Sequence, residues 1–325
     1  MAGQRTSSRF TVAAALGSLY IVWGTTYLAI RVAIQSIPPL LLAATVFTIA
    51  GPALVAIVIV RGGWTTGLPP ARHWLSAVLV GIGLVTFGNG SLMWGEQLVP
   101  SGIAAIVVAT VPAWLALFAR VYLRERLRRL TVAGLGLGFG GLVILAAPTG
   151  TGVGDLRGVT AVLLTAIGWA AGSVYSKRAP LPADPFLAAG MQMFCGGLVT
   201  LFVAISAGEL GRLDFARAAP QSAIAFAYLL VVGAIFAFGV FQWLVRNAQL
   251  SVVGTYAYVN PIVAVVLGAL FLGERLTVRT LGAGAVILVG VAVIVAAQAV
   301  TSEPSAVETE LSPSAAVQDA AKPKS

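Results

Sequence analysis

The chain has 325 residues, of which 58% are hydrophobic and 10% are charged, and its mean hydropathy is +0.95. Soluble globular domains carry roughly 25% charged residues, so this composition excludes a water-soluble fold and indicates that lipid surrounds most of the chain. The formal net charge of +9 does not indicate nucleic-acid binding, because the basic residues lie mostly in short gaps between apolar runs, where they orient membrane helices.

Ten apolar runs are long enough to cross the hydrocarbon core of a bilayer, which takes about 20 helical residues. In chain order they cover residues 11–33, 38–60, 74–95, 101–122, 130–148, 157–176, 184–207, 221–245, 251–272 and 279–298. Each run is too long for a barrel strand and none alternates at period two, so we predict ten helices. The first run exceeds the apolar core of a cleavable signal peptide, so we expect it to be retained.

Two polar flanks, residues 1–10 and 299–325, lie outside these runs. The C-terminal flank is rich in Ser, Ala, Pro and Glu and has no apolar run, which predicts a disordered tail. Ten spans place both flanks on one side of the membrane. If that side is the cytoplasm, most Lys and Arg residues fall in cytoplasmic loops, so we expect both termini there.

The sequence repeats itself at an offset of about 146–150 residues. Trp23 in the first run and Trp169 in the sixth are each followed eight residues later by a cation, Arg31 and Lys177. Near the end of the fourth run stands Leu-Arg-Glu-Arg-Leu, and near the end of the ninth stands Leu-Gly-Glu-Arg-Leu. The two halves of the chain are therefore copies of one unit.

Each unit holds five spans, an odd number, so the two copies would lie in the membrane with opposite orientations. We therefore predict an all-α membrane protein of ten transmembrane helices, built as two inverted five-helix repeats over residues 11–148 and 157–298. Inverted repeats are typical of transporters, because a pseudo-symmetric pair can rock between inward-open and outward-open states of similar energy.

Three stretches resemble the EamA repeats of the drug/metabolite transporter superfamily. They are Trp-Gly-Thr-Thr-Tyr at 23–27, Pro112 with the Leu-Arg-Glu-Arg-Leu that follows, and Asn260-Pro261 with Phe-Leu-Gly-Glu-Arg-Leu at 271–276. The resemblance covers roughly residues 11–298, and the N-terminal half is most similar to the YedA-like branch. It implies a ten-helix inverted-repeat fold, cytoplasmic termini in a bacterial plasma (inner) membrane, and export of amino acids, metabolites or drugs rather than catalysis.

The chain departs from the family pattern at two positions. Many relatives carry an arginine in the second helix where this chain has Val46, which argues against an anionic substrate. The first copy also has Arg124 where the second has Gly273.

Polar and aromatic residues inside the apolar runs are candidates for the wall of a solute cavity. Trp23 and Tyr27 share one face of the first helix, and Tyr256 and Asn260 share one face of the ninth. The full predicted set is Trp23, Tyr27, Asn89, Met93, Trp169, Ser173, Gln192, Tyr256 and Asn260. Amides, hydroxyls and rings suit a neutral, zwitterionic or amphipathic solute. The alternative for each residue is packing between helices or anchoring at the lipid headgroups.

Pro112 and Pro261 each remove a helical N–H bond, to the carbonyls of Val108 and Ala257. Their matched places predict helix breaks that assist gating, and a static kink is the alternative. Glu96 is the most central acid. We expect it to be a solvated loop residue, because Gln97 and Pro100 follow closely, with a protonatable coupling group as the alternative. Glu125 and Glu274 are expected to pair with arginines at helix ends.

The stretch Gly136-x-Gly138-x-x-Gly141 matches a dinucleotide-binding pattern formally, but no βαβ unit surrounds it. The spacings Gly134/Gly138 and Gly136/Gly140 instead predict close helix packing. One cysteine, Cys195, and one histidine, His73, make a disulfide impossible and a metal site implausible, so we expect no metal and no cofactor.

Two other classes of membrane protein remain as alternatives: an enzyme acting on lipid or peptide within the membrane, and a channel. No serine–histidine pair or pair of central acids supports the first, and no ring of like groups supports the second. The expected partners are a small-molecule solute and the lipid bilayer, with no nucleic acid, and a homodimer remains open.

Overall fold

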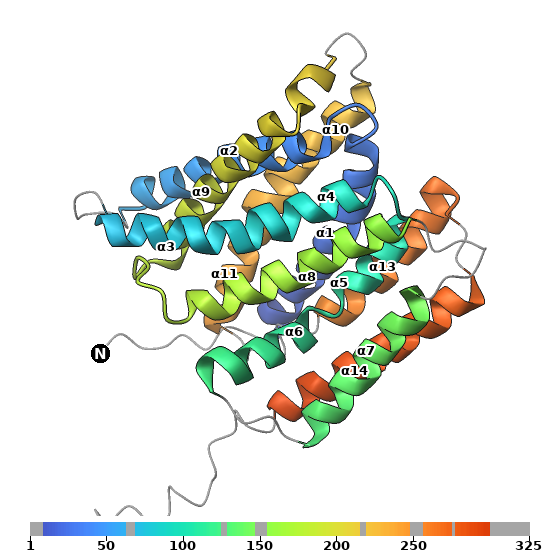
Figure 1. The fold of residues 1–325 in the computed structure, drawn as a ribbon. Coiled ribbons are helices and arrows are strands. Elements are labelled where there is room, and N and C mark those ends of the chain that lie inside the picture. The colour runs from blue at the N-terminus through green and yellow to red at the C-terminus, as the bar shows by residue number, and fades with distance from the viewer. Residues whose placement is uncertain are drawn as a thin grey trace, which may run out of the picture.

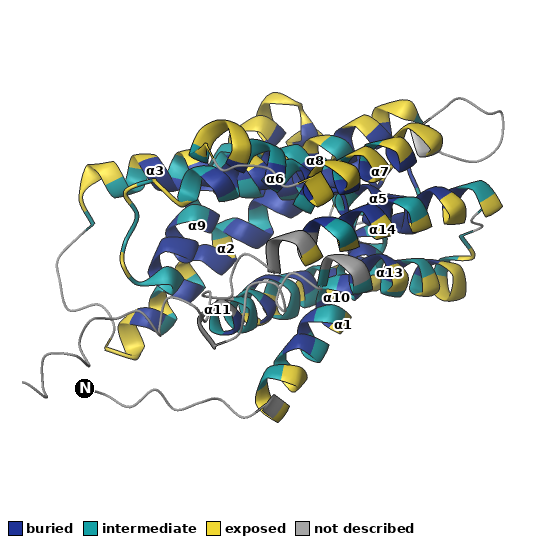
Figure 2. Ribbon diagram, turned by 90° about the horizontal axis from the view of Figure 1, so that it is seen from below, coloured by how far each residue is buried: buried dark blue, intermediate teal, exposed yellow. Residues whose placement is uncertain are grey.

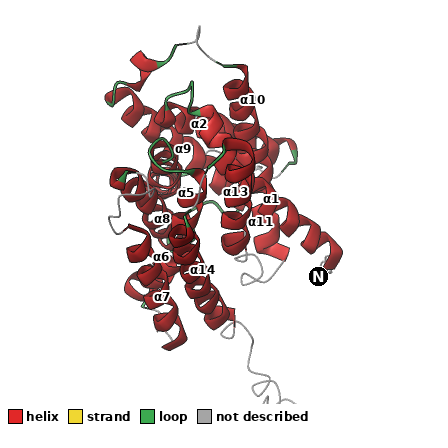
Figure 3. Ribbon diagram, turned by 90° about the vertical axis from the view of Figure 1, so that its right-hand side faces the viewer, coloured by secondary structure: helices red, strands yellow, loops and turns green. Residues whose placement is uncertain are grey.

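The computed structural model describes residues 9–62, 69–124, 129–146, 155–214, 219–247, 256–274 and 277–299. Within these ranges the chain is helical and contains no strand (Figure 1, Figure 3). The predicted all-helical class is therefore confirmed. The predicted tail lies outside the described residues. We call residues 9–146 the first half and residues 155–299 the second half.

The helices of the first half are α1 (Arg9–Ala33), α2 (Pro39–Val60), α3 (Ala71–Gly81), η1 (Ile82–Gly90), α4 (Ser91–Gly95), α5 (Ser101–Val108), α6 (Val111–Phe118), η2 (Ala119–Leu123) and α7 (Arg129–Ala146). Those of the second half are α8 (Leu156–Ser176), α9 (Pro185–Ser206), η3 (Glu209–Arg212), α10 (Pro220–Tyr228), η5 (Leu229–Phe236), α11 (Ala237–Asn247), α13 (Tyr256–Leu272) and α14 (Val278–Ala299).

Seven helical segments among the described residues are long and apolar enough to cross a membrane, and three shorter apolar helices accompany them. The seven are Phe10–Ala33, Pro39–Val60, Ala71–Gly95, Ser101–Leu123, Leu156–Ser176, Pro185–Ser206 and Pro220–Phe241, and the three are Arg129–Ile144, Val259–Leu272 and Val278–Ile294. Each of the ten predicted runs overlaps one of these segments.

Exposed residues cover the outside of the bundle and buried residues fill its interior (Figure 2). Many of the exposed residues are large and apolar. Phe202, Leu270 and Phe271 are each at least 70% exposed, whereas Leu19 and Leu42 are fully buried. Soluble monomers rarely expose continuous apolar surface of this extent, so the outer faces of these helices are suited to lipid.

Interhelical hydrogen bonds define two ends of the bundle. We call the end at which α1 ends and α2 begins the distal face, and the opposite end the proximal face. At the distal face the Leu41 amide donates to Glu209 over 2.9 Å, and the Ser222 hydroxyl donates to the Val32 carbonyl over 3.0 Å. The start of α2 therefore lies beside the end of α9, and the end of α1 beside the start of α10.

The two prolines behave differently. Pro112 stands in the first turn of α6, and the chain leaves the α-helix at Ala109 and Thr110, between α5 and α6. Pro261 lies inside α13, which continues through it. The α-helix is therefore interrupted beside Pro112 and continuous through Pro261, and the gating role of both prolines stays a prediction. A helix can accommodate an interior proline at the loss of one hydrogen bond when neighbouring helices hold it.

Glycines mark the closest helix crossings. A Cβ at Gly51 of α2 would lie 2.6 Å from the carbonyl oxygen of Gly190 in α9. A Cβ at Gly134 of α7 would lie 2.6 Å from the carbonyl oxygen of Gly290 in α14, which runs beside α7 (Figure 1). Only glycine allows backbones to approach so closely.

The prediction that another helix packs closely on the Gly136/Gly140 face was wrong, because a Cβ at either position would meet nothing within 4 Å. The contacting face of α7 instead carries Gly134 and Gly141, seven residues apart, with the backbone of Gly138 between them. A spacing of seven residues returns to the same side of a helix after about two turns.

Candidate functional site

One cavity of about 140 Å³ lies between the two halves. Its wall is formed by α1, α2, η1, α4, α5 and α6 from the first half and by α8, α9, η5, α11 and α13 from the second half. The helices α7 and α14 contribute no described lining residue. The polar and aromatic lining residues are Trp23, Thr26, Tyr27, Phe47, Asn89, Thr165, Trp169, Gln192, Phe238, Tyr256 and Asn260.

An aromatic cluster joins the halves on one side of this cavity. The Trp23 ring of α1 packs edge-on against Tyr256 of α13, with ring centroids 4.9 Å apart. Trp23 also lies 5.3 Å from Phe241 of α11, centroid to centroid. Such contacts stabilise an aromatic pair by about 0.5–1.5 kcal/mol beyond burial, so these rings hold one another in place.

Some polar groups of the wall already have a hydrogen-bond partner within the protein, and others do not. The Asn89 side-chain amide donates to the Leu84 carbonyl over 2.9 Å, a bond that crosses the wider turn of η1. The Oδ1 atom of Asn260 is buried and has no hydrogen-bond partner among the described residues. A buried acceptor without a partner costs roughly 1–3 kcal/mol, which a solute N–H or O–H can recover.

The structure brings most of the predicted cavity residues together. Seven of the nine line the larger cavity: Trp23, Tyr27, Asn89, Trp169, Gln192, Tyr256 and Asn260. Met93 lines a second cavity of about 80 Å³, which shares residues such as Trp23 and Asn89 with the first. Ser173 lines neither cavity. Pro261 lines the larger cavity, and Pro112 does not.

Sequence reasoning missed several lining residues. Thr26 lies one turn from Trp23 on α1, and its hydroxyl bonds the Trp23 carbonyl over 2.6 Å. The spacing of Trp23, Thr26 and Tyr27, three and four residues apart, could have identified it. Phe47 and Phe238 gave no such signal, because an isolated phenylalanine in an apolar run is equally suited to lipid.

The cavity walls carry no Asp, Glu, Lys or Arg among the described lining residues. Val46 lines the smaller cavity and is buried. The site therefore suits a solute without net charge, held by rings and a few amide and hydroxyl groups.

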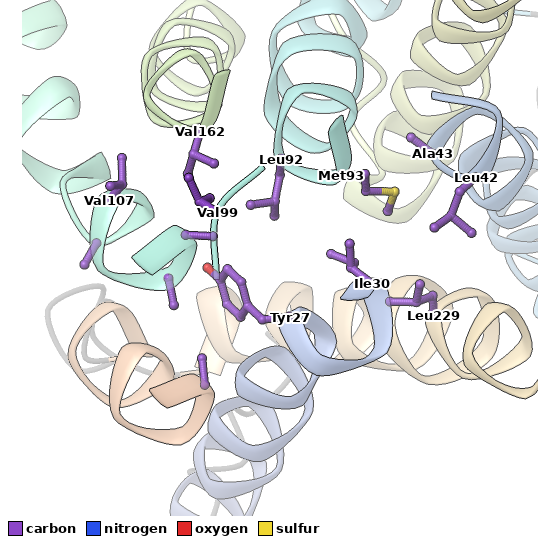
Figure 4. Close-up of a cluster of buried hydrophobic side chains, with 14 of the residues drawn as sticks. Tyr27, Ile30, Leu42, Ala43, Leu92, Met93, Val99, Val107, Val162 and Leu229 are labelled. Carbon is purple, nitrogen blue, oxygen red and sulfur yellow. The ribbon is translucent and has the colours of Figure 1, made fainter. Parts of the chain in front are cut away.

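Glu96 is fully buried, so its predicted exposure to solvent was wrong. Its main-chain carbonyl accepts a hydrogen bond from the Arg31 guanidinium at the end of α1. Figure 4 shows the surroundings of the helix that precedes it: Tyr27 projects from α1 toward Val99, and Leu92 and Met93 point into the same space.

Glu274 does not pair with an arginine among the described residues. Its carboxylate accepts from the Ser101 amide at 2.8 Å, the Ser101 hydroxyl at 3.0 Å and the Gly102 amide at 3.2 Å. The first amides of a helix have no partner within it, so Glu274 caps α5. The prediction for Glu125 falls outside the described residues.

Two carboxyl groups outside the spanning segments have shifted pKa values. Burial raises the pKa of the Glu209 carboxyl, against the opposing hydrogen bond from the Leu41 amide. Hydrogen bonds from Arg157 lower the pKa of Asp155, whose side chain also caps α8 through the Arg157 amide at 2.9 Å. Both groups fix helix ends at the distal face.

An all-helical bundle with apolar outer faces and an uncharged internal cavity defines a membrane protein that can hold a small molecule between its two halves. The chain belongs to the EamA-like transporter family, whose profile matches twice, at residues 10–147 and 156–296. It is a membrane transporter of this family.

Similar proteins carry transporter names. The chain is 39% identical over 264 residues to the uncharacterized inner membrane transporter YedA of Escherichia coli (strain K12), covering 81% of this chain and 83% of YedA. It is 27% identical over 274 residues to the uncharacterized transporter YvbV of Bacillus subtilis (strain 168), covering 84% and 88%. It is also 27% identical over 296 residues to the chloroplastic WAT1-related protein At3g02690 of Arabidopsis thaliana, covering 89% and 70%.

A protein crystal structure superposes on this chain with a TM-score of 0.62 and covers 91% of it and 100% of the other chain. The sequences are 24% identical, so this likeness concerns the fold.

Proposed function

We propose that the protein exports small neutral or amphipathic solutes, amino acids among them, from the bacterial cytoplasm by alternating access. The two five-helix halves act as inverted repeats, both termini lie in the cytoplasm, and the distal face meets the outside. The cavity binds the solute while one face closes and the other opens.

The observation that carries this proposal is the composition of the cavity wall. Four membrane segments of each half contribute to it, and the fifth segment of each half, α7 or α14, stays outside. A solute bound there contacts both halves at once, so its binding can favour one relative arrangement over another. Export, rather than import, follows from the family resemblance alone.

The unpartnered Asn260 oxygen supports a solute with an N–H or O–H group. The Trp23–Tyr256 pair supplies an apolar wall one helical turn from it. Together they suit a small amphipathic molecule, such as a neutral amino acid, better than an ion.

Counterflow in proteoliposomes tests the proposal. Vesicles loaded with unlabelled neutral amino acids should accumulate external label transiently and saturably. Flux that does not saturate would indicate a channel, and chemical change of the solute would indicate an enzyme.

Two variants test the site itself. Trp23→Ala and Asn260→Leu should abolish counterflow, because they remove the aromatic wall and the free acceptor. Ser173→Ala serves as the control and should retain counterflow, because Ser173 lines neither cavity. Wild-type flux in both Trp23→Ala and Asn260→Leu would remove this cavity from the transport path.

A further inference from the structure

Glu96 is a buried acid that the proposed solute site does not use. The residue is 0% exposed, and neither carboxyl oxygen has a hydrogen-bond partner among the described residues. An ionised carboxylate in an apolar interior is far more costly than the neutral acid unless it is paired and hydrogen-bonded. In this conformation the group is therefore held in its protonated form.

Glu96 stands directly behind the cavity wall. It follows α4, and within the preceding turn Leu92 lines both cavities and Met93 the smaller one. Tyr27 lines the larger cavity and interacts electrostatically with Glu96. A change in the charge of Glu96 would thus act on a residue that faces the solute.

The charged groups nearest to Glu96 do not neutralise it. Arg31 on α1 acts on it electrostatically, but its guanidinium donates to the main-chain oxygen of Glu96, and no ion pair with the carboxyl forms among the described residues. Glu274, after α13, also acts on it and carries the same sign of charge.

The other elements around it bring no free charge among the described residues. At the start of α8, Asp155 and Arg157 pair with each other over 2.6 Å. The sequence of α2 holds no titratable residue. Glu96 is therefore a buried carboxyl without an ion-pair partner among the described residues, and Arg31 is the cation that acts on it from a neighbouring helix.

We propose, on the basis of the transport function proposed above, that Glu96 is the proton-binding site that couples solute export to the proton gradient. When the distal face opens, water reaches the carboxylate, which binds one proton from that side. The neutral acid is carried through the distal-closed state. When the proximal face opens, the proton leaves through the cavity and the solute enters, so one proton moves inward for each solute exported.

The test measures the exchange of solute for solute and the accumulation driven by a proton gradient in separate assays. Proteoliposomes are assayed for counterflow of a labelled neutral amino-acid mixture without a pH gradient. They are then assayed for accumulation of the same label with the interior about one pH unit more acidic than the outside. For one-for-one exchange that gradient supports about a ten-fold accumulation.

Glu96→Gln fixes the residue in its neutral form, and in this cycle the solute binds only after the proton has left, so the variant should lose both counterflow and gradient-driven accumulation. The substitution preserves shape and breaks no carboxyl hydrogen bond among the described residues, so the fold should persist. Ser173→Ala, at a residue that lines neither cavity, is the control and should keep both activities.

Two results would overturn the coupling and leave the transport function standing. One is wild-type protein that shows counterflow but no accumulation of label under the pH gradient. The other is Glu96→Gln accumulating label as the wild type does. Absence of wild-type counterflow would instead contradict the transport function for this class of solute. A spectroscopic measurement that needs no solute tests the coupling proposal independently of the transport function. The infrared band of a protonated carboxyl should be present in the wild type at neutral pH and absent from Glu96→Gln, and its absence from the wild type would also refute the proposal.

Discussion

Arg124 and Gly273 stand at corresponding places in the two halves and share a left-handed backbone, with φ values of 60° and 63°. Arg124 ends η2 and Gly273 follows α13. Glycine adopts this conformation without strain, whereas a side chain costs about 1–2 kcal/mol there. The first half therefore has an arginine where the second has a glycine, but the backbone makes the same left-handed turn at both positions.

Arg124→Gly should stabilise the protein. Relief of the left-handed strain outweighs the extra freedom of glycine in the unfolded chain, which costs about 0.4–1 kcal/mol, so we expect a net gain of about 0.5–1 kcal/mol. Unfolding of the purified protein by SDS titration measures this. Gly273→Ala is the converse variant and should lose stability. Equal or lower stability of Arg124→Gly would show that the arginine side chain makes a compensating contact.

The cavity could be predicted at the residue scale to a useful extent. Trp23 with Tyr27, and Tyr256 with Asn260, repeat at four residues, so one helix face carries each pair. The burial of Glu96 and the hydrogen-bond partners of Glu274 could not be predicted. Whether an acid at a helix end meets water, an arginine or another helix depends on contacts between segments far apart in the sequence.

At the scale of elements, two of the three π-helical segments in the described residues, η1 and η5, occupy corresponding places in the two halves. Leu229, where η5 begins, lies 147 residues after Ile82, where η1 begins, and each segment lines the cavity from its own half. Such wide turns frequently occur at functional sites. The apolar helices follow from the length of the apolar runs, but a wider turn leaves that pattern unchanged, so the sequence did not predict these segments.

The pairing of α7 with α14 depends on one face of α7. Gly141→Leu should destabilise the protein by about 1–3 kcal/mol, because the new Cβ would lie 2.7 Å from the Ile287 side chain and 2.9 Å from the Ala283 carbonyl. Gly136→Leu, on the same helix with nothing within 4 Å, should be tolerated. Thermal unfolding in detergent compares the two. Equal effects would contradict the assigned contact face.

At the scale of the whole molecule, several contacts of the distal face join the two halves. Glu209 binds the start of α2, Glu274 caps α5, and the Ser36 and Ser222 hydroxyls lie 3.2 Å apart. A hydrogen bond contributes about 0.5–1.5 kcal/mol net, so together they favour the closed distal face by a few kcal/mol. Differential binding of a solute or proton can shift an equilibrium of that size.

A reversible cross-link at the distal face tests alternating access most directly. The variant Ser36→Cys/Ser222→Cys is made in a Cys195→Ser background, since Cys195 is the one native cysteine. Oxidation should join the two halves and stop counterflow, and reduction should restore it, while each single-cysteine variant stays active under both conditions. Full counterflow through the oxidised, cross-linked protein would contradict an account in which the distal face must open in every cycle.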